Sequence, residues 1–264
     1  MINLNYIFAM KRFLPFLLIL SASFYSCTSS TETDDSISSD IPLSTSASAT
    51  DVDGNVYEVS YNETEESLIH PIVQKFDANG DLIWEIEHDR SNVDVRAEIV
   101  TLDTQNRPWV VFSLNGGSSS NSYITLRASS ENAFSGVFQS NYGQGGGPTV
   151  SLIARINPEN GIIEKGTFVT AKLNNGNTNT LQIHGIGIAD GFVRVQAEST
   201  FRPPHTGTSF VPHPEADEYG PCGRFLLQID FTELLGEIVE SNLMTIQEAS
   251  ALPNTVWNAD CSIK

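Results

Sequence analysis

The sequence has little positive charge. It contains 14 Lys and Arg residues against 32 Asp and Glu residues, a formal net charge of −18 at pH 7. Such a surface repels a phosphate backbone, so the balance argues against a nucleic-acid partner. The same charge is typical of a solvated acidic surface and leaves cations open as a class of ligand.

The sequence also lacks a hydrophobic run of the roughly 20 residues that a membrane-spanning helix needs. Near the start, Lys11 and Arg12 precede a short apolar stretch from Phe13 to Leu20. A positive segment followed by a short apolar core predicts a secretory signal peptide, which we place at residues 1–26. Met10 directly precedes the positive pair, and we expect it to be the true start of the protein.

Cysteines are few and their number is odd: Cys27, Cys222 and Cys261. An odd count in an exported protein needs an explanation. Lipidation of Cys27 provides one, because it leaves an even pair in an oxidising compartment. We therefore predict a disulfide between Cys222 and Cys261. The alternative is a pair of buried free thiols.

The residues before Cys27 carry a resemblance. Phe24-Tyr25-Ser26-Cys27 is similar to a relaxed lipobox of the bacterial lipoprotein family: Ser26 fits the pattern, whereas Phe24 stands where an aliphatic residue is usual. The resemblance implies a diacylglycerol and palmitate anchor in the outer membrane, with the protein on the periplasmic or cell-surface side. The alternative is ordinary signal-peptide cleavage near Ser21-Ala22-Ser23.

The segment after Cys27 is rich in Ser, Thr and acidic residues and poor in large apolar ones. Such a segment cannot bury enough surface to offset the entropy of ordering it. We predict a lipidated disordered tether at residues 27–43 and an all-β repeat domain at residues 44–264.

The body shows a repeated β pattern. In Ile72–Ile86, two apolar-alternating runs flank Asn79-Gly80, which is the strongest short-range signal for a hairpin. Segment Asp51–Ser60 carries a similar Asp- and Gly-containing turn before its alternating run. The same rhythm returns in four more segments: Ile99–Phe112, Leu152–Ile163, Leu181–Val195 and Phe225–Val239.

Residues 51–86 contain the patterns D-x-x-G-N-x-Y and K-x-D-x-x-G-x-x-x-W. They resemble the β-propeller repeat families of exported bacterial proteins. This resemblance implies a propeller-like array of about three four-stranded repeats. Closed propellers usually have four to eight blades, so a β-sandwich with blade-like hairpins stays as the alternative.

Two insertions, residues 115–148 and 201–221, interrupt the rhythm. We expect their loops to contact a protein or glycan ligand. The predicted contact residues are Tyr142, His205, His213 and Tyr219. The imidazoles of the second insertion, with Glu215, Asp217 and Glu218, also offer zinc-type ligands, although their spacing matches no compact metal motif and a solvent-exposed loop is the alternative.

In each of two turns, side chains that carry oxygen atoms alternate along the chain near a glycine. Calcium prefers such oxygen ligands. Turn formation explains the same residues, since Asp and Asn side chains bond to their own backbone. We expect no cofactor, with calcium as the alternative, whose candidate ligands are Asp51, Asp53, Asp77, Asn79 and Asp81.

The sequence shows no nucleophile elbow and no Cys/His pair suited to catalysis, and no two carboxylates stand out for glycosidase chemistry. We therefore expect a binding or scaffold lipoprotein that makes its contacts through loops. A glycan-directed or other extracellular hydrolase is the rival function, and an inert structural spacer is a third.

Overall fold

We describe a computed structural model of the 264-residue chain. It describes residues 40–63, 65, 68–88, 93–116, 128–145, 147, 149–208, 211–217 and 220–264. These residues belong to one compact unit, residues 37–264. The predicted signal peptide, Cys27 and Tyr219 lie outside the described residues.

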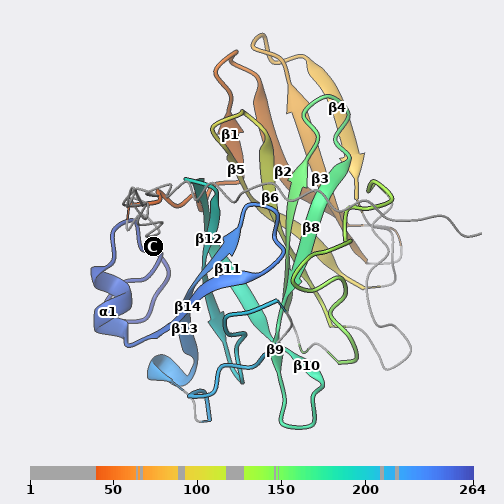
Figure 1. Ribbon diagram of the computed structural model, residues 1–264. Helices are drawn as coiled ribbons and strands as arrows, with labels where there is room; N and C mark the ends of the chain where they lie inside the picture. Colours follow the sequence, from red (N-terminus) through yellow and green to blue (C-terminus); the bar gives the residue numbers. More distant parts are fainter. Residues whose placement is uncertain are drawn as a thin grey trace, which may run out of the picture. The chain divides into compact units, whose positions relative to one another are not determined.

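The described chain is an all-β fold, as predicted, with three four-stranded antiparallel sheets (Figure 1). In each sheet the strands follow one another in chain order. The first contains β1 (Ser48–Thr50), β2 (Val56–Glu63), β3 (Ile69–Phe76) and β4 (Leu82–Glu87). The second contains β5 (Val95–Leu102), β6 (Pro108–Leu114), β7 (Val150–Ile156) and β8 (Ile163–Val169). The third contains β11 (Leu181–Ala189), β12 (Phe192–Ser199), β13 (Phe225–Thr232) and β14 (Ile238–Met244).

The remaining elements are short. β9 (Ala171–Lys172) and β10 (Thr178–Asn179) form a two-stranded ladder between the second and third sheets in the sequence. A 3-10 turn, η1 (Pro221–Gly223), precedes β13, and the helix α1 (Ile246–Ala251) follows β14. Among the described residues, no helix has the length and apolar character needed to cross a membrane.

Asp-containing turns close three of the hairpins in the same way. Asp51, Asp77 and Asp103 each accept hydrogen bonds from the backbone N–H groups two and four residues further on. Each turn also places one residue in the left-handed region, namely Gly54, Gly80 and Asn106. This local chemistry favours Asp at the first position and Gly or Asn near the fourth, and it confirms the predicted Asn79-Gly80 hairpin between β3 and β4.

The middle sheet is buried on both faces, which the alternation along β6 makes plain. Val110, Phe112 and Leu114 belong to a hydrophobic cluster shared with the first sheet. Trp109 and Val111 belong to a second cluster shared with the third sheet. Because successive side chains of a strand point to opposite faces, one strand contributes to both cores.

The third sheet is covered on its other face by the end of the chain. Leu226 and Met244 pack there against Ala249 of α1 and against Val256 and Trp257. A capping box between Thr245 and Glu248 fixes the start of α1. The predicted disulfide between Cys222 and Cys261 is confirmed, with a Cα–Cα distance of 6.0 Å.

The segment before β1 packs on the body. Ile41 is buried, and the Ser44 backbone pairs with Ile186 in β11. The Ser44 hydroxyl also donates to the Val100 carbonyl in β5. Residues 41–43, which the sequence assigned to the tether, are thus packed on the third sheet, where Gly185 and Gly187 leave room for them.

Candidate functional site

Hydrogen bonds hold the second insertion against β14, a strand of the third sheet. The His205 N–H donates to the Val211 carbonyl, and the His213 N–H donates to the Pro203 carbonyl. The Ser241 hydroxyl of β14 donates to the Pro204 carbonyl at 2.9 Å. A proline has no N–H to donate, but its carbonyl can still accept a hydrogen bond, as the carbonyls of Pro203 and Pro204 do here. The loop is therefore held against β14 by its backbone.

The structure brings His205 and His213 together, with ring centroids 4.6 Å apart. His213 is buried, and burial lowers its pKa below the usual value, with a smaller contribution in the same direction from His205. Glu215 and a backbone hydrogen bond with Ser241 act in the opposite direction. His213 is thus held mainly as a neutral imidazole against the loop.

No group of three or more His, Cys, Asp or Glu side chains that could hold a metal ion occurs among the described residues. The His213 Nδ1 already faces the Glu215 N–H at 3.4 Å. Glu218, another residue of the predicted ligand set, lies outside the described residues. Within the described residues, the histidine pair is therefore not part of an assembled metal centre.

The second insertion also forms one side of a small cavity of about 120 Å³. Its walls come from four parts of the chain: the β9–β10 turn, the residues that follow β12, the later part of the second insertion, and the start of β13. Polar and aromatic side chains share the lining, which consists of Asn174, Thr200, Phe201, Arg202, Ala216, Asp217 and Phe225.

Arg202 brings a positive charge to the wall of this cavity. Its backbone pairs with Lys172 of β9, which fixes the position of the residue. Its guanidinium lies 3.3 Å from an Asp217 carboxylate oxygen, and that carboxylate side chain is 75% exposed. The Arg202 Nε is buried and has no hydrogen-bond partner within the described part of the chain. The guanidinium thus keeps hydrogen-bonding capacity that none of the described residues uses.

Of the other predicted contact residues, Tyr142 lies in the core. It has no exposed surface, and its ring packs edge-on against Phe168 in the cluster between the first two sheets. The first insertion therefore contributes this tyrosine to packing. None of the four predicted contact residues is among the described residues that line the cavity, although the His213 carbonyl accepts from the N–H of Ala216, which does line it.

The predicted calcium ligands form two separate turns. Asp51 accepts from Asn55, including its side-chain amide at 2.8 Å, and Asp77 accepts from the side-chain amide of Asn79 at 3.2 Å. These bonds, with those to the backbone, lower the pKa of Asp51 and Asp77 against the effect of burial. The hydrogen bonds within each turn therefore account for the positions of these side chains.

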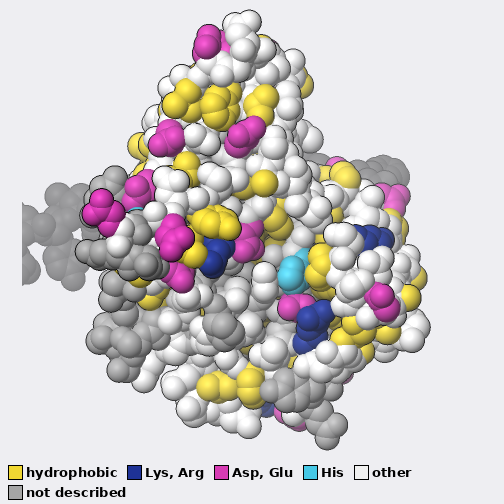
Figure 2. All heavy atoms as spheres, turned by 180° about the vertical axis from the view of Figure 1, so that it is seen from behind, with side chains coloured by type: hydrophobic (Ala, Val, Ile, Leu, Met, Phe, Trp, Pro, Cys, Tyr) yellow, Lys and Arg dark blue, Asp and Glu magenta, His cyan; other side chains and the backbone are white. Residues whose placement is uncertain are grey.

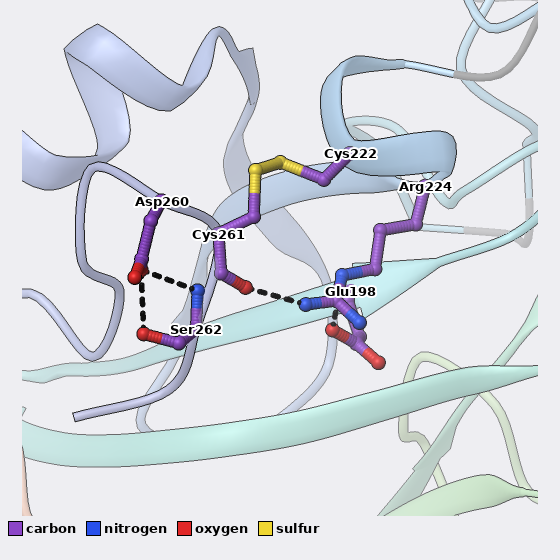
Figure 3. The surroundings of a disulfide bond; sticks show 6 residues. All are labelled: Glu198, Cys222, Arg224, Asp260, Cys261 and Ser262. Carbon is purple, nitrogen blue, oxygen red and sulfur yellow. Dashed lines mark hydrogen bonds and ion pairs between the residues drawn. A yellow bond between two sulfur atoms is a disulfide. The ribbon is translucent and has the colours of Figure 1, made fainter.

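A third group of polar residues joins the disulfide to the third sheet (Figure 3). Arg224 donates to the Cys261 carbonyl at 2.7 Å and lies 2.8 Å from Glu198. His184 lies 3.3 Å from the same carboxylate. Burial alone would raise the pKa of Glu198, but the hydrogen bond and charge of His184, with the charge of Arg224, bring it below the usual value. This group fastens the end of the chain to the third sheet.

The comparisons with known proteins place the chain in no family. No protein-family model matches the sequence, and no curated protein matches it.

Sequence reasoning did not single out six of the residues that line the cavity: Asn174, Thr200, Phe201, Arg202, Ala216 and Phe225. They come from separate strands and turns, and only the fold places them together. The available signal was an arginine beside a phenylalanine, Phe201-Arg202, at the start of a proline-rich insertion.

Proposed function

We propose that this protein is an exported outer-membrane lipoprotein, anchored through Cys27, that binds a small ligand or part of a larger one in the Arg202 cavity. The leader pattern and the lipobox resemblance support the anchor. The cavity supports the binding role, because it combines hydrogen-bonding groups with aromatic walls, as small-molecule sites do. Its ligand reaches the protein on the periplasmic or cell-surface side.

The body acts as the support for this site. Three consecutive four-stranded sheets pack face on face, so we propose a propeller-like array that does not close on itself. A β-sandwich-like arrangement is compatible with the same sheets. In both architectures the strands fix the ends of the loops that line the cavity.

One observation carries the binding proposal: Arg202 stands in a cavity, and the ion-pair partner that it has among the described residues is a mostly exposed carboxylate. A buried donor without a partner is costly, so a residue placed this way gains when a ligand supplies the acceptor. Of the described residues that line the cavity, one carries a carboxylate, Asp217, whereas most glycoside hydrolases use two. The geometry therefore favours binding over hydrolysis.

Two measurements test the proposal. Labelled palmitate should enter the wild-type chain and should not enter a Cys27→Ala variant, whereas equal labelling of both would overturn the anchor. A panel of small sugars, amino acids and carboxylic acids, followed by ligand-observed NMR, should give binding that Phe201→Ala weakens. No binding across the panel, or binding unaffected by Phe201→Ala, would overturn the role of the cavity.

A further inference from the structure

We propose that the Arg202 cavity recognises an acidic sugar unit, with Arg202 binding the sugar's carboxylate. This inference rests on the proposed binding function and names the class of its ligand. Cationic side chains are scarce in this chain, with 14 Lys and Arg against 32 acidic residues, and Figure 2 shows Asp and Glu side chains spread over one face with few Lys and Arg among them.

The ion pair of Arg202 differs from the other arginine ion pairs of the described chain. Arg107, Arg155, Arg194 and Arg224 all pair with carboxylate side chains that are at most 34% exposed. The partner of Arg202, Asp217, is 75% exposed and lies at 3.3 Å. An exposed pair of this kind contributes little, so a ligand carboxylate can replace Asp217 at small cost.

A carboxylate suits both the shape and the charge of the guanidinium. The planar fork of an arginine matches the two oxygens of a carboxylate and forms paired, charge-assisted hydrogen bonds with it. The acidic surface elsewhere does not forbid this, because charges more than about 8 Å away are largely screened at physiological salt. Local contacts therefore decide the sign of the ligand.

The rest of the lining points to a sugar as the body that carries the carboxylate. Thr200 and Asn174 offer a hydroxyl and an amide that can bond to sugar hydroxyls. Phe201 is 38% exposed and offers an aromatic wall against which a pyranose ring can pack. The cavity, at about 120 Å³, is smaller than the ~300–1,000 Å³ of typical ligand pockets, so it fits one unit of a glycan.

The test compares D-galacturonate with D-galactose, which differ only at the carboxylate-bearing carbon. The full-length lipoprotein in detergent is titrated with each sugar and followed by ligand-observed NMR. Galacturonate should bind at least about tenfold more tightly than galactose, since a hydrogen bond to a charged group is worth that factor or more. An N-acetylated dipeptide with a free carboxyl end serves as a second source of the same group and should bind more weakly than galacturonate.

Four variants localise the effect. Arg202→Gln should weaken galacturonate binding by at least about tenfold, so that galacturonate no longer binds more tightly than galactose. Arg96→Gln makes the same charge change on β5, where Arg96 lies over the Tyr61 ring, and should leave both sugars unchanged. Asp217→Asn removes the competing carboxylate and should tighten galacturonate binding, which tests the idea even if Arg202→Gln fails to fold. Phe201→Ala should weaken both sugars.

The outcomes separate the two proposals. Equal binding of galactose and galacturonate, weakened by Phe201→Ala, would keep the binding function and overturn the acidic ligand. Tighter binding of the dipeptide than of galacturonate would overturn the sugar. Failure of all three probes to bind would overturn the sugar-acid inference, while the broader panel described above decides the binding function separately.

Discussion

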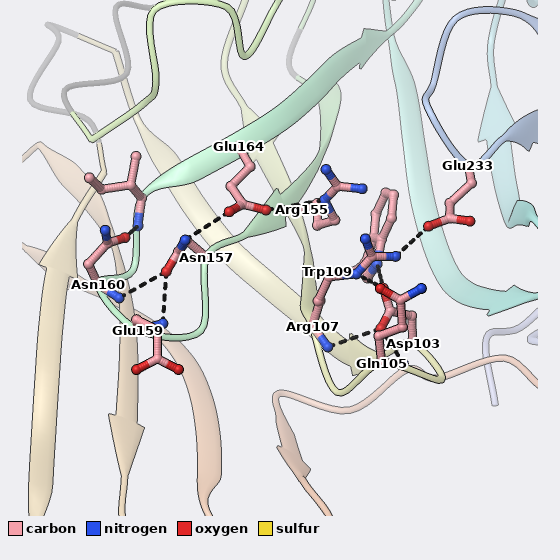
Figure 4. Close-up of polar contacts among 11 residues, drawn as sticks. Asp103, Gln105, Arg107, Trp109, Arg155, Asn157, Glu159, Asn160, Glu164 and Glu233 are labelled. Atoms are coloured by element: carbon pink, nitrogen blue, oxygen red, sulfur yellow. Dashed lines mark hydrogen bonds and ion pairs between the residues drawn. The ribbon is translucent and has the colours of Figure 1, made fainter.

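Arg107, in the turn between β5 and β6, forms an ion pair with Glu233, in the turn between β13 and β14 (Figure 4). The same guanidinium donates to Asp103 at 2.7 Å, and Asp103 also accepts from the buried Trp109 indole at 3.0 Å. One arginine thus ties a hairpin turn of the second sheet to a hairpin turn of the third. A comparable tie joins the first two sheets, where Lys75 and Trp84 both donate to the Pro158 carbonyl.

We predict that Glu233→Gln lowers the free energy of unfolding by no more than about 1 kcal/mol, because the pair is partly exposed. Arg107→Ala should cost more, since it also leaves Asp103 without its cation. A double-mutant cycle measured by urea denaturation gives the coupling between the two residues, expected at about 0.5–1 kcal/mol. A coupling of zero would contradict a link between the sheets at this point. The Arg155–Glu164 pair, which stays within the second sheet, is the matched comparison.

The buried pair of Arg194 and Asp230 gives a larger prediction. These residues face each other on β12 and β13, with two hydrogen bonds of 2.7 and 2.9 Å, and both are almost completely buried. Burial raises the pKa of Asp230, even though Arg194 pulls it down. Arg194→Met alone leaves a carboxylate buried without its cation and should cost about 3–5 kcal/mol. The double variant Arg194→Met/Asp230→Leu should recover much of that loss. Urea denaturation measures the stability of the three proteins, and a double variant less stable than Arg194→Met would refute the argument.

His88 predicts a dependence of stability on pH. It is fully buried beside Phe112, and burial lowers its pKa from 6.5 to about 4. The unfolded chain therefore takes up a proton first as the pH falls, so this contribution to stability is complete above pH 6.5 and is lost progressively down to pH 4. The expected loss is about 3 kcal/mol over that window.

Urea denaturation at several pH values measures this effect. The wild-type chain should lose stability between pH 6.5 and 4 more steeply than a His88→Phe variant, whatever the variant's stability at neutral pH. Parallel curves for the two proteins would show that His88 is not the titrating group.

The parts of the structure that local chemistry determines were predictable from the sequence. The Asp77–Asn79-Gly80 turn predicts a hairpin because the bonds that form it lie within five residues. The Cys222–Cys261 disulfide could be predicted because the assignment of Cys27 to a lipid anchor leaves one pair of cysteines. The buried positions of Tyr142 and His88 depend on how two sheets pack, which a local pattern does not encode. The cavity residues, among them Arg202, come from separate segments and could not be grouped from the sequence for the same reason.

The last prediction concerns the segment before β1, whose packing on β11 the sequence did not indicate. A Cβ atom on Gly187 would overlap the Pro42 carbonyl and crowd the Ile41 side chain. Gly187→Ala should therefore displace residues 41–43 and lower the free energy of unfolding by about 1–3 kcal/mol, as overpacking does. Gly236→Ala is the control, because the nearest atom to its new Cβ would be the Gly136 carbonyl oxygen at 3.5 Å. Thermal unfolding and limited proteolysis separate the two cases. Equal unfolding midpoints for the two variants would mean that residues 41–43 do not stabilise the fold. A lower midpoint for Gly187→Ala, with faster proteolysis before residue 44, would show that the stable body begins at Ile41.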